Sequence, residues 1–261
     1  MCMLVDVITR NAIWKGQDDF PYDSLSQDEL EKWLNYIKNK CWWGSYFSRL
    51  TKEPIKKRDE ALAEIHSAFF LEEIKGFVVK EREPKGANNK RGEFILSVGG
   101  IDIFCEVKSP GWESEIVKKE GINSSRLRQG KHLPFEVRWT GISEFIQGTV
   151  NNAYEKFSED KANLLIIVDD FWVPLFHQPP VQRNLTLYNA LYYQSRPASC
   201  QDPPSGCFTS SSFENLSGVL FLNIKEKNNQ FEYQNQLCIN AFAKMELPDA
   251  LKNQLDVFQM T

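Results

Sequence analysis

The sequence has no uninterrupted apolar run close to the roughly 20 residues that a membrane-spanning helix requires. Its first ten residues, MCMLVDVITR, also lack the long apolar centre of a secretory signal. We therefore expect a soluble, cytoplasmic protein without a membrane partner.

Cysteine and histidine are sparse and show no metal-binding pattern. No two cysteines have the CxxC spacing of a zinc ribbon, and the three histidines are far apart in the chain. Scattered cysteines in a chain of this length favour reduced thiols over a disulfide scaffold. We assign no metal to these residues, which are Cys2, Cys41, Cys105, Cys200, Cys207, Cys238, His66, His132 and His177.

Two signatures of common small-molecule enzymes are also missing. The chain contains neither a glycine-rich phosphate loop nor the GxSxG turn that presents a nucleophilic serine. A small-molecule enzyme that uses carboxylates is therefore the weakest of the functional hypotheses that follow.

Positive charge is in short supply, because the formal net charge is −4. Nucleic-acid binding depends on local lysine and arginine, so an acidic protein must concentrate them. The segment between Val117 and Trp139 does so against only two acids, Glu120 and Glu136. We expect it either to contact phosphates or to be a solvated loop; its basic residues are Lys118, Lys119, Arg126, Arg128, Lys131 and Arg138.

The most informative stretch is Arg91 to Pro110, RGEFILSVGGIDIFCEVKSP. Two β-branched, apolar runs flank Gly99-Gly100, and such a pair is typical of a two-residue hairpin turn. This turn places Val98 opposite Ile101 and, further out, Glu93 opposite Glu106. Alternation then predicts one wholly apolar core face, formed by Phe94, Leu96, Val98, Ile101, Ile103, Cys105 and Val107.

The other face of this hairpin carries Glu93, Glu106 and, one step further along, Lys108, together with Ile95, Ser97, Asp102 and Phe104. Two carboxylates about 5 Å apart across a strand pair repel each other unless a cation lies between them. A divalent metal ion is one candidate for that cation. The alternative is an ordinary solvated sheet face, since surface strands often carry glutamate and lysine.

Periodicity predicts the elements around the hairpin. A capping box at Ser26 begins a helix over 27–40, and helical spacing recurs over 54–75 and from Ile142 to Phe157. Strands are expected over 77–81 and 163–169, the second buried on both faces, and later over 217–224 and 231–239. Residues 170–214 suggest long loops, with a short helix near 187–194, and 247–258 suggest a helical tail.

These features resemble the PD-(D/E)xK nuclease superfamily, whose signature is an acid starting one strand, a hairpin, and then an acid, any residue and lysine. The matching positions are Glu93, Glu106 and Lys108, with Gly92 where the family usually has proline and Glu93 where it usually has aspartate. The resemblance implies an α/β, restriction-endonuclease-like core in the order α-β-β-β-α-β, with a mixed sheet flanked by helices and a helical N-terminal segment.

The resemblance also implies a division of the chain. Residues 1–56 would form the helical N-terminal segment packed on the core, and 57–261 the nuclease-like domain. Within that domain the core would span 57–170, the long loop region 170–214, and the C-terminal strands and helix 215–261.

The resemblance further implies a chemistry. Glu93, Glu106 and the Val107 carbonyl would bind Mg²⁺ or Mn²⁺, and Lys108 would steady the attacking hydroxide or the developing phosphorane charge. Glu64 matches the first-helix acid of the superfamily, although an exposed helix glutamate is an equal alternative. The implied activity is hydrolysis of phosphodiester bonds, with DNA favoured over RNA; we leave open whether the protein forms a homodimer.

Two departures from the family pattern, at Gly92 and Glu93, and the acidic net charge support a second hypothesis. In it, the protein keeps the nuclease fold but has weak or no activity and serves as a nucleic-acid or protein binding module.

Overall fold

The protein is described here from a computed structural model over residues 26–51, 55–109, 138–168, 179–194, 205–227 and 230–259. None of the helices in these ranges is both long and apolar enough to cross a membrane.

A six-stranded mixed sheet runs through the molecule in the order β1-β2-β3-β4-β5-β6. β1, β2 and β3 are mutually antiparallel, β3, β4 and β5 are parallel, and β5 and β6 are antiparallel. The strands are β1 Val78–Arg82, β2 Phe94–Val98, β3 Ile101–Lys108, β4 Ala162–Val168, β5 Gly218–Lys227 and β6 Gln230–Ile239. All six strands expected from the sequence are therefore confirmed.

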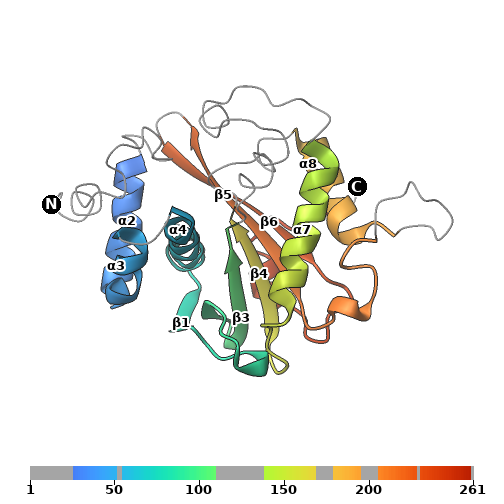
Figure 1. Ribbon diagram of the computed structural model, residues 1–261, viewed down its shortest axis with the longest axis horizontal. Helices are drawn as coiled ribbons and strands as arrows, with labels where there is room; N and C mark the ends of the chain where they lie inside the picture. The colour runs from blue at the N-terminus through green and yellow to red at the C-terminus, as the bar shows by residue number, and fades with distance from the viewer. Residues whose placement is uncertain are drawn as a thin grey trace.

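Helices cover both faces of this sheet, so the fold is a three-layered mixed α/β arrangement (Figure 1). On one side lie α2 Ser26–Asn39, α3 Trp43–Thr51 and α4 Ile55–Phe69, which continues as the π-helix Phe70–Ile74. On the other side lie α7 Arg138–Tyr154 and α8 Pro180–Leu187, which continues as the π-helix Tyr188–Tyr192. Two 3-10 turns, Ala87–Asn89 and Ser211–Phe213, and the short helix α9 Asp249–Lys252 complete the described elements.

The hairpin expected at Gly99-Gly100 is confirmed in its register. Both glycines have positive φ, at 58° and 86°, which residues with a side chain rarely adopt. Val98 pairs with Ile101 and Phe94 with Cys105. The Glu93 amide also donates to the Cys105 carbonyl, at 2.9 Å, so the regular register ends at Phe94.

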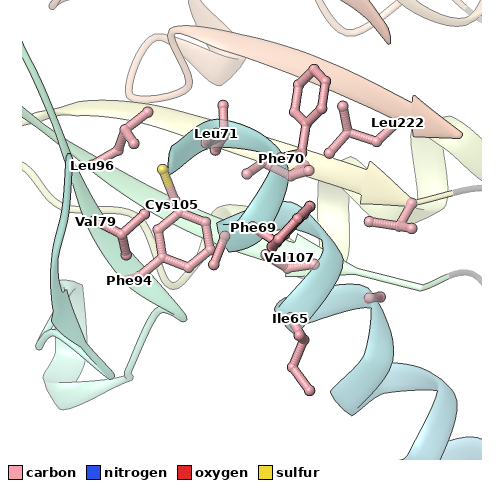
Figure 2. Packing of buried hydrophobic residues seen from close by; sticks show 14 of the residues in the cluster. Ile65, Phe69, Phe70, Leu71, Val79, Phe94, Leu96, Cys105, Val107 and Leu222 are labelled. Atoms are coloured by element: carbon pink, nitrogen blue, oxygen red, sulfur yellow. The ribbon is translucent and has the colours of Figure 1, made fainter. Parts of the chain in front are cut away.

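The apolar face of the hairpin packs against α4, as Figure 2 shows for Phe94, Leu96, Cys105 and Val107. These side chains meet Ile65, Phe69, Phe70 and Leu71 of α4 and its π-turn, which carry the apolar spacing seen in the sequence. Ile101 is the exception, since about half of its surface is exposed beside the turn.

The alternative of an ordinary solvated second face is wrong where α7 covers the hairpin. Ile95 and Phe104 belong to a second apolar cluster, formed with Ile142, Ile146 and Val150 of α7 and with residues of β4 and β5. Glu106 lies on that same face with none of its surface exposed. The physical reason is that α7 needs a partner for its own apolar stripe and lies over this face of the sheet.

Three boundaries differ from the sequence-based expectation. The helix expected near 187–194 begins earlier, at Pro180, because proline is favoured in the first turn of a helix. The helix expected over 54–75 ends in a π-helical turn. The helical tail expected over 247–258 is restricted to α9, because the chain then extends along β6: Leu237 donates to the Asp256 carbonyl and Phe258 to the Leu237 carbonyl.

Candidate functional site

Two glutamates face each other at the open end of the β2–β3 hairpin. Glu106 lies within β3 and is fully buried, while Glu93 stands immediately before β2 and is partly buried. The paired positions of β2 and β3 end at Phe94 and Cys105, one step short of the pairing of Glu93 with Glu106 that the sequence predicted. The two glutamates are nevertheless close enough for the charge of Glu106 to act on Glu93. The structure therefore brings together the two acids that the sequence singled out.

Two lysines bind one oxygen of Glu106. Lys108 Nζ lies 2.7 Å and Lys156 Nζ 2.5 Å from Oε1. The second carboxylate oxygen, Oε2, is buried and has no hydrogen-bond partner among the described residues. A buried anion with one oxygen doubly engaged and the other unsatisfied retains a strong demand for a further cation or donor.

The third acid, Glu64, is 5% exposed on α4, so the exposed-glutamate alternative is wrong. Arg49 of α3 holds it with a bidentate ion pair, at 2.7 Å to Oε2 and 2.6 Å to Oε1. Arg82 of β1 lies 4.0 Å from Oε2, and its guanidinium stacks over the Tyr46 ring at 4.4 Å from the ring centre. Glu64 is thus the centre of a cluster that joins α3, α4 and β1.

A polar pocket of about 380 Å³ connects these groups. It is lined by Glu64, Glu93, Val107 and Lys108, and by Lys156. Glu106 lies behind the pocket wall, where it binds the two lysines that form the wall. The other lining residues are Arg49, Lys57, Glu60, Arg82, Glu83, Arg91, Gly92 and Ser109.

The electrostatics of the pocket act most strongly on Glu93. Burial, followed by the negative charges of Glu64 and Glu106, raises the pKa of this carboxyl from 4.5 to about 8, although Lys156 and Arg49 oppose the shift. At neutral pH and without an added cation, Glu93 is therefore largely protonated.

Lys156 remains protonated in the same pocket. Burial lowers the pKa of its ammonium group, but the hydrogen bond and the charge of Glu106 outweigh burial and leave the pKa above the usual value. The pocket consequently presents basic side chains to any ligand that enters it.

Two glycines, Gly86 and Gly92, allow the backbone to pack closely against Phe104 and Lys156 beside the pocket. A Cβ atom on Gly92 would lie 2.4 Å from the Phe104 ring, and one on Gly86 would lie 2.0 Å from the Lys156 carbonyl oxygen. Gly92 also donates its amide to the Pro84 carbonyl at 3.0 Å, which proline could not do. This accounts for glycine at the position where the PD-(D/E)xK pattern usually has proline.

The donor set suits a hard divalent cation. Carboxylate oxygens and a backbone carbonyl are the ligands that Mg²⁺ prefers, and the unsatisfied Oε2 of Glu106 is an available acceptor. Across the described ranges, no group of three or more His, Cys, Asp or Glu is arranged to hold a metal ion. A metal here would therefore use two carboxylates, Glu93 and Glu106, with the Val107 carbonyl and water.

The basic segment predicted to bind phosphates cannot be placed. Its first five basic residues lie outside the described residues, and Arg138 is the first residue of α7, where only the backbone is described. Its role stays a prediction; the residues concerned are Lys118, Lys119, Arg126, Arg128, Lys131 and Arg138.

Sequence reasoning missed three cations of the site: Arg49, Arg82 and Lys156. Lys156 sits between the helical stripe of α7 and β4, in a run, EKFSEDK, that resembles any solvated loop. The one available signal was indirect, because a buried carboxylate requires a cation. That signal predicts that a partner exists but does not say which residue supplies it.

Comparisons with known proteins add little to this geometry. No family model and no curated protein matches the chain. Among solved structures, the chain is similar to the structure of Pyrococcus furiosus SfsA in complex with Ca²⁺, with 14% identity over 76% of this chain. The chain spans 62% of that protein, less than two thirds, and the TM-score is 0.22. A likeness this weak carries no argument about function.

Proposed function

We propose that this protein is a metal-dependent nuclease with a restriction-endonuclease-like core, hydrolysing phosphodiester bonds in DNA in preference to RNA. The observation that carries the proposal is the partly buried Glu93 and the fully buried Glu106 beside Lys108 at a polar pocket that Glu93 and Lys108 line. The element order α4, β1, β2, β3, α7, β4 supports it, since this is the order of the superfamily core.

The metal would be Mg²⁺ or Mn²⁺, held by Glu93, Glu106 and the Val107 carbonyl. When bound, it would polarise the phosphodiester and acidify a water molecule. Glu93 must lose its proton to become a ligand, because its raised pKa keeps it protonated at neutral pH. Lys108 would remain beside the site as a donor to the charge that develops on the phosphate oxygens.

Substrate entry is expected at this pocket, whose lining includes the cations Lys57, Arg91 and Lys108. These side chains are accompanied by acids, so their attraction for a phosphate chain is local and modest. The basic segment that follows β3 would supply further phosphate contacts, since it leaves the site directly after Ser109.

The direct test is incubation of the purified protein with plasmid, single-stranded DNA and RNA in Mg²⁺, in Mn²⁺ and in chelator. We expect cleavage of DNA that requires the metal and leaves 5′-phosphate ends, as the superfamily resemblance implies. Absence of cleavage for all three substrates with both metals would reject the nuclease proposal.

The matched control is Glu106→Gln, which retains the side-chain shape and removes a ligand charge. We expect it to lose Mn²⁺ binding in calorimetric titration and to lose cleavage. We also expect a folding cost of about 1 to 3 kcal/mol, because two lysines lose their buried counter-charge but are themselves partly exposed. Unchanged Mn²⁺ affinity in the folded variant would exclude this metal site.

One observation favours a second candidate, an anion-binding module without metal chemistry. Glu106 already has two lysine partners, and Glu64 has a bidentate arginine. Such a protein would bind nucleic acid equally well in chelator and in Mg²⁺, and would cleave it in neither. A gel-shift series in both conditions separates the two candidates.

A further inference from the structure

Lys156 is held in place by its backbone. It lies just after α7, where its carbonyl oxygen would be 2.0 Å from a Cβ on Gly86, and the next residue, Phe157, accepts a hydrogen bond from Ala87 at 3.3 Å. Lys90 also forms an ion pair with Glu155. The turn between β1 and β2 therefore docks onto the end of α7 and fixes the point from which Lys156 reaches Glu106.

Glu106 carries one negative charge and contacts two positively charged lysines. One carboxylate meets two ammonium groups on a single oxygen, at 2.5 and 2.7 Å, while its other oxygen has no partner among the described residues. The two ammonium groups repel each other through this arrangement. A divalent ion at the free Oε2 of Glu106 would add to that repulsion, so it competes with the two lysines and favours displacement of one of them.

Lys156 is better suited than Lys108 to be displaced from Glu106 by a divalent ion. Lys108 is two residues from Glu106 on the same strand, so its reach is tied to the acid. Both lysines line the pocket and keep a similar part of their side chains exposed, so the difference is that Lys156 comes from a separate segment and is not tied to Glu106 by the strand. A lysine released into this pocket would find a phosphate as its natural partner, because ammonium groups bind phosphate as point charges.

We propose that Lys156 is a second functional lysine of this site: it neutralises Glu106 when no divalent cation is present, and it binds the substrate phosphate when a divalent cation takes Glu106. This inference rests on the proposed nuclease function and extends it. It adds a residue that the superfamily signature does not include.

One consequence is coupling between the metal and the phosphate. A phosphate that attracts Lys156 weakens the competition for Glu106 and so favours the metal, and by linkage the metal favours the phosphate to the same extent. An uncharged ligand in the same pocket produces no such effect, because it has no attraction for the ammonium group.

The experiment measures Mn²⁺ affinity by calorimetry, alone and with thymidine 3′,5′-bisphosphate, which has no phosphodiester bond to cleave. Thymidine serves as the uncharged control, and a titration of the nucleotide without protein corrects for direct chelation. In the wild-type protein, the bisphosphate should tighten Mn²⁺ binding and thymidine should not.

The informative variant is Lys156→Gln, which keeps an N–H donor for Glu106 and removes the charge. It should bind Mn²⁺ alone about tenfold more tightly, because one competing charge is gone, and the effect of the bisphosphate should largely disappear. Cleavage should fall although the metal binds better. Lys156→Arg should restore the coupling, and Lys161→Met, which removes a lysine paired with Asp160 on the same connection, should match the wild type.

The outcomes separate the two proposals. If the wild-type protein neither binds Mn²⁺ nor cleaves, the nuclease function fails and the role of Lys156 fails with it. If the wild-type protein binds and cleaves but Lys156→Gln has the same Mn²⁺ affinity and coupling, only the role of Lys156 is overturned. Thermal unfolding of both Lys156 variants shows whether the comparison is between folded proteins.

Discussion

Each charged residue at this site is best described by the partner whose charge it neutralises. Lys108 and Lys156 share one oxygen of Glu106, and Arg49 takes both oxygens of Glu64. Glu93 is the acid whose pKa is raised, first by burial and then by the negative charges of Glu64 and Glu106.

Lys108 gives the simplest prediction for the proposed reaction. Lys108→Met should lower the cleavage rate by about a hundredfold or more, which is the typical effect of removing one donor to developing charge. Mn²⁺ affinity should be kept or increased, because the lysine is a competitor of the metal and not its ligand. Steady-state cleavage and calorimetry test the two parts, and full activity would show that the catalytic strand has been misassigned.

Glu93 gives a prediction about pH. Its pKa is about 8 in the folded protein and close to 4.5 when unfolded, so between these values the folded state holds more protons. The stability that this group contributes is present below pH 4.5 and is lost as the pH rises toward 8. Without divalent cations, Glu93→Gln should therefore gain stability relative to the wild type between pH 5 and pH 8, on the order of 1 kcal/mol for a partly exposed group.

Denaturant unfolding of both proteins at several pH values measures this difference. A stability gap that does not change between pH 5 and pH 8 would mean that Glu93 is ionised throughout the range. Addition of Mn²⁺ should close the gap, because a bound cation favours the ionised carboxylate.

At the scale of elements, the helices before the sheet contribute to the site as well as covering the core. α3 provides Arg49 and Tyr46, α4 provides Glu64, and β1 provides Arg82. The ion pair between Arg49 and Glu64 thus ties the first part of the chain to the pocket wall.

The double change Arg49→Met with Glu64→Gln tests this tie. Arg49→Met alone should destabilise the fold by about 2 to 4 kcal/mol, because it leaves a buried carboxylate without its main counter-charge. The double variant should recover part of that loss, since the uncompensated charge is then absent. Chemical denaturation of the cycle gives the coupling energy, and additive effects would show that the pair contributes no specific interaction.

The elements that the sequence predicted are those defined by local patterns. Gly99-Gly100 and the alternation around it were enough to give the hairpin, its register from Val98–Ile101 to Phe94–Cys105, and the proximity of Glu93 and Glu106. The tail helix was predicted too long, because the backbone after Lys252 forms hydrogen bonds with Leu237 of β6, a pairing that the local pattern of 247–258 does not contain.

The candidate site was predictable only in part, because some of its residues come from segments outside the hairpin. Glu93, Glu106 and Lys108 lie on one hairpin. Arg49 and Lys156 reach the site from segments about 50 residues away on either side. The presence of Ile95 and Phe104 on the acidic face was a sign that this face is covered. Without knowing that α7 lies there, we could not infer how deeply Glu106 is buried.

At the scale of the whole molecule, the acidic charge requires that phosphate contacts be concentrated. We predict that Arg126→Ala combined with Lys131→Ala weakens nucleic-acid binding for all sequences alike. The slope of log affinity against log salt should fall by between about one and two, because each phosphate that is no longer neutralised lowers it by roughly 0.7 to 0.9. Fluorescence anisotropy over a salt series measures the slope, and an unchanged slope would place the substrate path elsewhere.

The separation in sequence between the acids and their cations has a consequence for the order of folding. The β2–β3 hairpin closes through a two-residue turn, so Glu93 and Glu106 meet through a local contact that forms early. Lys156 follows Glu106 by 50 residues and arrives when β4 joins β3 in parallel. For that interval the two carboxylates have only Lys108 as a nearby counter-charge, and we expect the chain to refold faster under mildly acidic conditions that keep one of them protonated.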